Sequence, residues 1–205
     1  MSVRLFLARH GQTSWNVASR YMGQEDIPLD QTGNQQAFAL GLRLSGETLS
    51  AIYSSDLIRA WQTASAIAVH HTCPVISEPR LREMDFGSWQ GMTYVEIQQN
   101  DQINLEAWEA DRLKNSPPGG ESLYQFSSRV GAAFESVIRN HSEGTILLVA
   151  HGGTLKMLLC FVLGIPPEQY WRFQLSSASL TEIWMYPEGG SLNLLNDTSH
   201  LKGGA

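Results

Sequence analysis

Apolar residues in this chain gather in short continuous runs, and the stretches between the runs place apolar residues at helical spacing. The continuous runs predict β-strands at residues 3–8, 51–53, 74–76, 145–150, 180–186 and 192–195. The spaced stretches predict a helix that begins at Asp30 and ends near Gly46, and further helices over residues 56–69, 121–140 and 154–163. Because helices alternate with strands that are apolar throughout, the pattern indicates a three-layer α/β/α fold whose mostly parallel sheet is covered on both faces.

Two parts of the chain depart from this alternation. The last two predicted strands are separated only by residues 187–191, and are expected to form an antiparallel hairpin at one edge of the sheet. Residues 83–120 carry many polar residues, several aromatic ones and a Pro-Pro-Gly-Gly turn, which predicts a helical insertion over a pocket. Trp89, Tyr94 and Trp108 either line an apolar substrate wall or belong to the core. No linker or repeat divides the chain, so residues 1–205 are expected to form one domain.

Composition restricts the partners. The chain has 205 residues, of which 42% are hydrophobic and 17% charged, and its formal net charge of -6 disfavours nucleic acid. No signal peptide precedes the first strand, and no stretch approaches the roughly 20 apolar residues of a membrane-spanning helix. We therefore expect a cytoplasmic protein without a membrane partner. Cys73 and Cys160 are expected to be inert thiols, and residues 202–205 a loose end.

Two histidines follow predicted strands in the same local context. His10 closes the run Leu-Ala-Arg-His-Gly, and His151 closes the run Val-Ala-His-Gly. In open α/β sheets, ligands bind outside the carboxyl ends of parallel strands. His10 and His151 are therefore expected to meet at one rim of the sheet, and their matching contexts favour a functional role over a structural one.

Two arginines would make this rim an anion site. Arg9 precedes His10, and Arg59 lies on a helix that Asp56 is expected to cap. Guanidinium groups are planar, permanently charged donors that suit phosphate oxygens. The positive charges should lower the pKa of His10 and leave a neutral, nucleophilic ring at pH 7. A phosphoryl group fits this arrangement, with the arginines and His151 on its equatorial oxygens.

The leaving oxygen of a phosphate ester also needs an acid. Glu83 is the favoured candidate, because it precedes a turn at Phe86-Gly87 and a bound phosphate would favour its protonated form. Asp85 is the competing candidate.

Taken together, these motifs resemble a known family. They comprise Arg9-His10-Gly11-Gln12-Thr13 with Trp15-Asn16, Ser54-Ser55-Asp56 with Arg59-Ala60 and Gln62-Thr63, Glu83 before Phe86-Gly87, and Ala150-His151-Gly152-Gly153. In this order they resemble the histidine phosphatase superfamily, also called the phosphoglycerate mutase-like family, from about residue 3 to 201. A lone Arg-His-Gly tripeptide is a weak signal, whereas the ordered set is highly specific.

The resemblance implies a mechanism and a role for each matching position. His10 would carry the transient phosphoryl group, inside a pocket formed with Arg9, Arg59 and His151. Glu83 would donate a proton to the leaving group and then act as the base for attacking water. The remaining implied phosphate or substrate contacts are Asn16, Gly11 and Gly152. The family uses no metal or organic cofactor for this chemistry.

The choice of branch depends on the segment after the acid. Mutases of the family carry extra basic residues there, whereas here Arg112 and Lys114 are the only bases before Pro117. The run Pro118-Gly119-Gly120-Glu121-Ser122 is similar to the branch of α-ribazole, metal-independent phosphoserine and broad-specificity phosphatases. This favours a hydrolase of a small phosphorylated metabolite, whether phosphoserine, α-ribazole phosphate, phosphoglycerate or a sugar phosphate.

Three alternatives stay open. The first is a cofactor-dependent phosphoglycerate mutase. The second is a zinc-dependent hydrolase that uses His10, His151 and Glu83 as ligands, although two arginines would repel the metal. The third is a non-catalytic phosphate-binding protein. His200 has no assigned role, and pairing into a homodimer is left open.

Overall fold

The computed structural model describes residues 3–201 and is built on a six-stranded sheet in the order β3-β2-β4-β1-β5-β6. The strands are β1 (Val3–Arg9), β2 (Ala51–Ser54), β3 (Val75–Ser77), β4 (Gly144–Ala150), β5 (Leu180–Tyr186) and β6 (Gly189–Asp197). The first four pair in parallel, and β5 and β6 form an antiparallel hairpin beside β1. The mixed, mostly parallel sheet and its edge hairpin confirm the predicted fold class.

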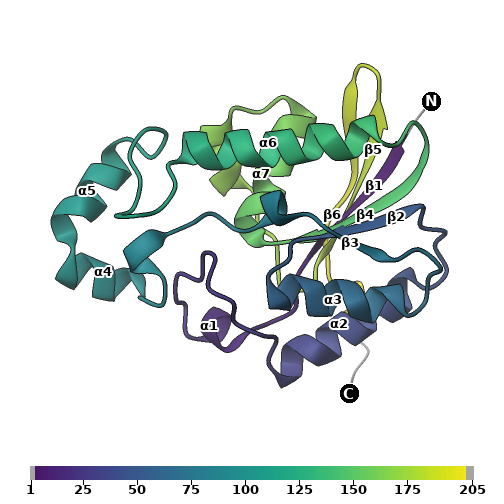
Figure 1. Cartoon of the computed structure of the whole chain (residues 1–205), viewed down its shortest axis with the longest axis horizontal. Helices are drawn as coiled ribbons and strands as arrows, with labels where there is room; N and C mark the ends of the chain where they lie inside the picture. The colour runs from purple at the N-terminus through teal and green to yellow at the C-terminus, as the bar shows by residue number, and fades with distance from the viewer. Residues whose placement is uncertain (1–2, 202–205) are drawn as a thin grey trace.

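Helices cover both faces of this sheet (Figure 1). One layer holds α2 (Gln31–Leu44) and α3 (Ile58–Ala68), and the opposite layer holds α6 (Leu123–Arg139) and α7 (Gly152–Leu163). A hydrophobic core lies on each face of the sheet, and side chains along β1 point to the two faces in turn. Leu5 and Leu7 pack with α6 and α7, whereas Phe6 and Ala8 pack with α2 and α3. A strand buried on both faces must be apolar at every position, which is the pattern read in the sequence.

The predicted start of α2 is confirmed, but the predicted start of α3 is wrong. Asp30 caps α2 by accepting a 2.7 Å hydrogen bond from the Gly33 amide. Asp56 does not cap α3, because its carboxylate pairs with Arg82 at 2.5 Å. Helix α3 begins one residue after Leu57, and the Ile58 amide donates instead to the distant Asp26 carboxylate at 2.6 Å.

The insertion contains α4 (Tyr94–Asn100) and α5 (Gln102–Ala110), which project beyond the sheet in Figure 1. Short 3-10 helices η1 (Pro79–Leu81) and η2 (Gly87–Trp89) precede them. Trp89 and Trp108 are buried against each other in a small core that also contains Ile97 and Leu105, while Tyr94 is 41% exposed. The two tryptophans thus belong to the core of the insertion.

The insertion is tied to the segment that follows β1. This segment begins with α1 (Ser14–Val17), and shortly after it Arg20 pairs with Glu96 of α4 at 2.9 Å. Arg20 also forms a backbone bridge with Thr93 and donates to the Gly91 carbonyl. The ring of Tyr21 packs edge-on against Phe86, with centroids 4.8 Å apart. These contacts hold the insertion beside the loop that carries His10.

The chain leaves β1 and β4 toward opposite faces of the sheet. The helix after β1 is α2, in one layer, and the helix after β4 is α7, in the other. Adjacent parallel strands whose connections diverge in this way leave a crevice at their carboxyl ends. The remaining elements are η3 (Pro167–Arg172) and η4 (Ser199–Leu201), and within residues 3–201 no helix has the length and apolar character needed to cross a membrane. The expected loose end at 202–205 lies outside the described residues.

Candidate active site

His10 and His151 occupy equivalent positions at the carboxyl ends of β1 and β4. Arg9 and Ala150 are partners in the parallel ladder, and the His10 amide donates to the Ala150 carbonyl at 3.0 Å. Both imidazoles are buried, with ring centroids 5.2 Å apart and ring planes tilted by 58°. The structure therefore brings the two predicted histidines together at one rim.

Hydrogen bonding fixes the tautomer of His10. Its Nδ1 lies 2.7 Å from the carbonyl oxygen of Gly11, and because a carbonyl can only accept, Nδ1 must carry the proton. The lone pair is then on Nε2. Burial is the main cause that holds the pKa of His10 well below 6.5, and the positive charges of Arg59 and Arg9 lower it further. A neutral ring with a free lone pair is the form that a nucleophile requires.

Arg59 is fully buried and connects the rim to the loop that follows α1. Its Nη1 donates to the Glu25 carbonyl at 2.6 Å, its Nη2 to the Gly23 carbonyl at 2.7 Å, and its Nε to His151 at 3.1 Å. These bonds use three of the five N–H groups of the guanidinium and leave two for another acceptor. Burial lowers the pKa of Arg59 to about 10, so the group is still a cation at neutral pH.

Both ring nitrogens of His151 are engaged. Nδ1 accepts the hydrogen bond from Arg59, so Nε2 carries the proton and donates to the hydroxyl of Ser55 at 2.8 Å. Burial and the neighbouring Arg59 cation hold the pKa of His151 well below 6.5. His151 is thus a neutral donor that is oriented from two sides.

Arg9 adds a second, partly buried guanidinium to the rim. Its Nη1 donates to the Leu175 carbonyl at 2.7 Å, but its buried Nε has no hydrogen-bond partner among residues 3–201. Burial lowers the pKa of Arg9, as expected for a cation removed from water. Unpaired buried donors are rare in proteins, and an anion bound at the rim would supply the acceptor.

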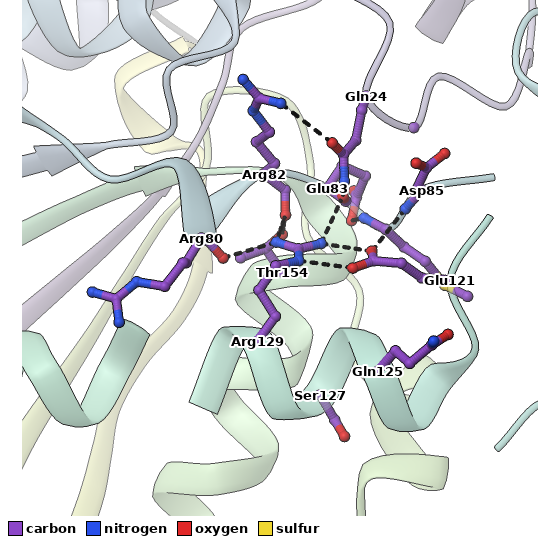
Figure 2. Close-up of polar contacts among 12 residues, drawn as sticks. Gln24, Arg80, Arg82, Glu83, Asp85, Glu121, Gln125, Ser127, Arg129 and Thr154 are labelled. Carbon is purple, nitrogen blue, oxygen red and sulfur yellow. Dashed lines mark hydrogen bonds and ion pairs between the residues drawn. The ribbon is translucent and has the colours of Figure 1, made fainter. Parts of the chain in front are cut away.

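Glu83 reaches the same rim from the segment between η1 and η2 (Figure 2). Its Oε2 accepts from the Gly153 amide at 2.9 Å, and its Oε1 accepts from the Met84 amide at 3.0 Å. The charge of Glu83 partly offsets the lowering of the pKa values of Arg9 and Arg59 by burial. The side chain of the competing candidate, Asp85, accepts a 2.8 Å hydrogen bond from the Gly87 amide. Asp85 is therefore engaged in a local turn, and Glu83 remains the candidate acid.

The three remaining predicted contacts have different surroundings. The side-chain oxygen of Asn16 accepts from the Thr13 amide at 3.0 Å within the capping box of α1. Gly11 donates its amide to the Thr63 hydroxyl at 3.1 Å and packs against the backbone of Gly33, so its amide is already occupied. Gly152 is the first residue of α7 and lies next to Arg9, where a Cβ would be 3.5 Å from the Arg9 Nε.

Lys156 is a further cation near the site that sequence reasoning missed. It lies one turn after Gly152 and Gly153, on the face of α7 that meets Arg9 and Glu83. Burial lowers the pKa of Lys156, while the nearby Glu83 carboxylate raises it. Within the described part of the chain, no carboxylate lies within 4.0 Å of its ammonium. Its spacing from Gly152 was the available signal, since helical residues four apart lie on one face.

Comparison with known proteins assigns the family. The model of the histidine phosphatase superfamily (branch 1) matches residues 5–198. The chain belongs to this superfamily. A phosphoserine phosphatase 1 of Hydrogenobacter thermophilus is 35% identical over 199 residues, covering 97% of this chain and 94% of the relative.

Two other members of the superfamily show the range of names among similar proteins. A probable phosphoglycerate mutase GpmB of Proteus mirabilis is 35% identical over 209 residues, covering 97% of this chain and 95% of the relative. The crystal structure of an α-ribazole phosphatase from Shigella flexneri superimposes with a TM-score of 0.89 at 32% identity, over 95% of this chain and 96% of that one. Full-length similarity to members of this histidine phosphatase family confirms the resemblance read from the motifs.

Proposed function

We propose that this histidine phosphatase family member hydrolyses phosphate monoesters through a phosphohistidine on His10. The observation that carries the proposal is the state of His10, a buried ring that burial and the charges of Arg59 and Arg9 keep neutral, with its lone pair on Nε2. In the first half-reaction this lone pair forms the N–P bond while the ester P–O bond breaks. The proton stays on Nδ1, hydrogen-bonded to the Gly11 carbonyl oxygen, and this bond stabilises the positive charge that the ring gains.

The phosphoryl group would be held by donors already in place. The free N–H groups of Arg59 and the unpaired Nε of Arg9 are available to it. The ring of His151 lies beside His10, and its Nε2–H would join them by exchanging its bond to Ser55 for one to a phosphoryl oxygen. Because the transition state of phosphoryl transfer spreads negative charge over three oxygens, donors placed beforehand stabilise it without reorganisation. We assign Asn16 a supporting contact from the loop that follows Gly11.

Glu83 would serve both half-reactions. A bound phosphate repels the negative charge of the Glu83 carboxylate, so substrate binding favours its protonated form. The acid then transfers its proton to the oxygen that leaves as the alcohol. In the second half-reaction the carboxylate takes a proton from water as the water oxygen forms the new P–O bond and the N–P bond breaks.

We propose that this reaction proceeds without a metal. A zinc site would need lone pairs from His10, His151 and Glu83 directed at one point. Both nitrogens of His151 are used by Arg59 and Ser55, and within residues 3–201 no three His, Cys, Asp or Glu side chains are grouped to share a metal. Two arginine cations beside His10 further oppose a dication.

Hydrolysis is favoured over mutase activity by the basic residues of the insertion. Lys114 is 80% exposed and pairs with Asp111, and Arg112 lies over the ring of Trp108, 4.3 Å from its centroid. Both are therefore engaged within the insertion itself. Similar proteins named as phosphoserine and α-ribazole phosphatases support the same assignment, and the GpmB name represents the mutase alternative.

The position of Lys156 points to substrates that carry a second anionic group. Lys156 is half-buried and lies one turn after Gly152 and Gly153, which adjoin Arg9 and Glu83. A substrate carboxylate close to the phosphate, as in phosphoserine or phosphoglycerate, would form an ion pair with the Lys156 ammonium. A charge-assisted hydrogen bond contributes about 1.5–3 kcal/mol, which corresponds to roughly 10- to 100-fold in kcat/KM.

Steady-state assays with phosphoserine, 3-phosphoglycerate, a sugar phosphate and p-nitrophenyl phosphate test this proposal. Lys156→Met should lower kcat/KM for the two carboxylated substrates about 10- to 100-fold and leave p-nitrophenyl phosphate within about threefold. Lys114→Met is the matched control and should change neither, because its charge is exposed and paired locally.

Three results would count against this assignment. Equal effects on all substrates would remove Lys156 from substrate recognition. Failure of the wild-type protein to hydrolyse any phosphomonoester would overturn the hydrolase assignment. Conversion of 3-phosphoglycerate into its isomer on addition of 2,3-bisphosphoglycerate, without phosphate release, would identify a mutase.

A further inference from the structure

The segment that carries Glu83 has no regular secondary structure of its own. Residues 82–86 lie between η1 and η2, outside the sheet and the helices. The backbone polar groups of such a segment must be paired with other elements. The geometry of the acid therefore depends on the contacts made to this short stretch.

Arg129 of α6 contacts this part of the chain from one side (Figure 2). Its Nη1 donates to the carbonyls of Arg80 and Arg82 at 2.8 and 3.0 Å, and its Nη2 donates to the carbonyl of Glu83 at 3.1 Å. The remaining N–H groups form a two-pronged ion pair with Glu121 at 2.8 and 2.7 Å. All five N–H groups of the guanidinium are thus used, three of them on the backbone around the acid.

Glu121 completes the arrangement from the other side of the acid. Its Oε2 accepts from the Asp85 amide at 3.0 Å, and its own amide donates to the Asp85 carbonyl at 2.9 Å. The Arg129–Glu121 pair therefore holds the backbone at residues 80, 82, 83 and 85. Both side chains are about 20% exposed, at 21% and 20%, so the pair is largely shielded from water.

A second helix holds the same segment by independent contacts. In α7, the Thr154 hydroxyl donates to the Arg82 carbonyl at 2.9 Å, and the Gly153 amide donates to the Glu83 carboxylate at 2.9 Å. The α7 contacts fix the side chain of Glu83 relative to His151. The α6 contacts fix the backbone from which that side chain extends.

We propose that Arg129 and Glu121 form a positioning clamp that sets the reach of the Glu83 carboxyl to the leaving-group oxygen. Neither residue touches the substrate, so both act through Glu83, and the inference rests on the proposed function. Proton transfer requires the acid within hydrogen-bond reach of the departing oxygen, and a displacement of about 1 Å costs on the order of 10²-fold in rate. Lysine keeps the charge of Arg129 but cannot make the planar set of five bonds.

The test compares a poor leaving group with a good one. Arg129→Lys should lower kcat/KM about 10- to 100-fold for an alkyl ester such as phosphoserine, and less than about threefold for p-nitrophenyl phosphate, whose phenolate leaves without an acid. The ratio kcat/KM reports the steps up to alcohol release, so slow water attack on the phosphohistidine does not obscure the comparison. Glu121→Gln should also slow the alkyl ester more than p-nitrophenyl phosphate. If Arg129→Lys does not fold, Glu121→Gln serves as the test variant.

Two controls separate positioning from a general structural role. Arg80→Gln removes a neighbouring ion pair, formed with Glu78 at 2.6 Å, while leaving its backbone carbonyl available to Arg129, and should leave both substrates unchanged. In a Glu83→Gln background, Arg129→Lys should add less than about threefold, because residues that act through one group are not additive.

The outcomes are distinguishable. An active wild-type enzyme in which Arg129→Lys slows both substrates equally would overturn the clamp alone, and so would an undiminished effect in the Glu83→Gln background. Wild-type protein that hydrolyses neither substrate would overturn the proposed function, and the clamp with it.

Discussion

At the scale of single residues, the two rim histidines connect the site to stability. His10 and His151 are buried, and burial together with Arg59 holds both pKa values well below 6.5. As the pH falls below about 6.5, the unfolded chain takes up protons at these histidines but the folded protein does not. Their contribution to stability is therefore complete above pH 6.5 and is lost as the pH falls from there toward the folded pKa values.

This linkage can be measured by urea unfolding between pH 7 and 5.5. Each histidine contributes a slope of at most about 1.4 kcal/mol per pH unit. The non-titrating His10→Asn variant should therefore lose roughly 1 kcal/mol less stability than the wild-type protein over this interval. Identical pH dependence in the two proteins would show that His10 titrates normally in the folded state.

At the scale of elements, the first turn of α2 is docked against the loop that carries the catalytic candidate. A Cβ on Gly33 would collide with the Gln12 carbonyl, and the Asp30 amide donates to that same carbonyl at 3.0 Å. The Gln12 amide in turn donates to the Gln36 side chain at 2.8 Å. The position of the loop after β1 is thus set by close contact between backbones.

Gly33→Ala tests whether this contact outweighs helix propensity. Propensity alone predicts stabilisation of α2 by about 1 kcal/mol, because alanine is the better helix former. The collision with Gln12 predicts instead a loss of about 1–3 kcal/mol of stability and a lower kcat/KM, as the His10 loop is displaced. Thermal unfolding and turnover measure the two effects.

Gly46→Ala is the matched control for this substitution. Gly46 is exposed, and a Cβ there meets nothing within 4 Å. Its stability and activity should stay at wild-type values. An unchanged or more stable Gly33→Ala variant with full activity would show that the docking of α2 does not constrain the loop.

At the scale of the whole molecule, the sequence predicts the fold and the meeting of the two histidines because both follow from strand rules. Two apolar runs that end in His-Gly belong to parallel strands, and the pairing of Arg9 with Ala150 brings the following residues together. Contacts between loops have no such periodic signal. The pairing of Asp56 with Arg82, the bonds from Arg59 to the loop carbonyls, and the contacts of Arg129 therefore emerge only from the structure.

The same distinction applies to the insertion. Its aromatic residues could line a substrate wall or belong to the core, and Trp89 and Trp108 are buried in the core of the insertion. Lys156, the cation to which we assign a role in substrate choice, lies on α7 instead. Side-chain burial within an irregular segment depends on which neighbours fold over it, and spacing alone does not encode that.

Trapping the phosphoenzyme tests whether His10 carries the phosphoryl group. Protein mixed with substrate in the presence of EDTA and quenched in alkali should carry an acid-labile, alkali-stable phosphate on His10, located by mass spectrometry. The label should be absent from His10→Asn, which keeps His151 and both arginines but lacks the nucleophile. Full turnover by His10→Asn would rule out His10 as the nucleophile, and wild-type turnover that EDTA abolishes and zinc restores would rule out a metal-independent reaction.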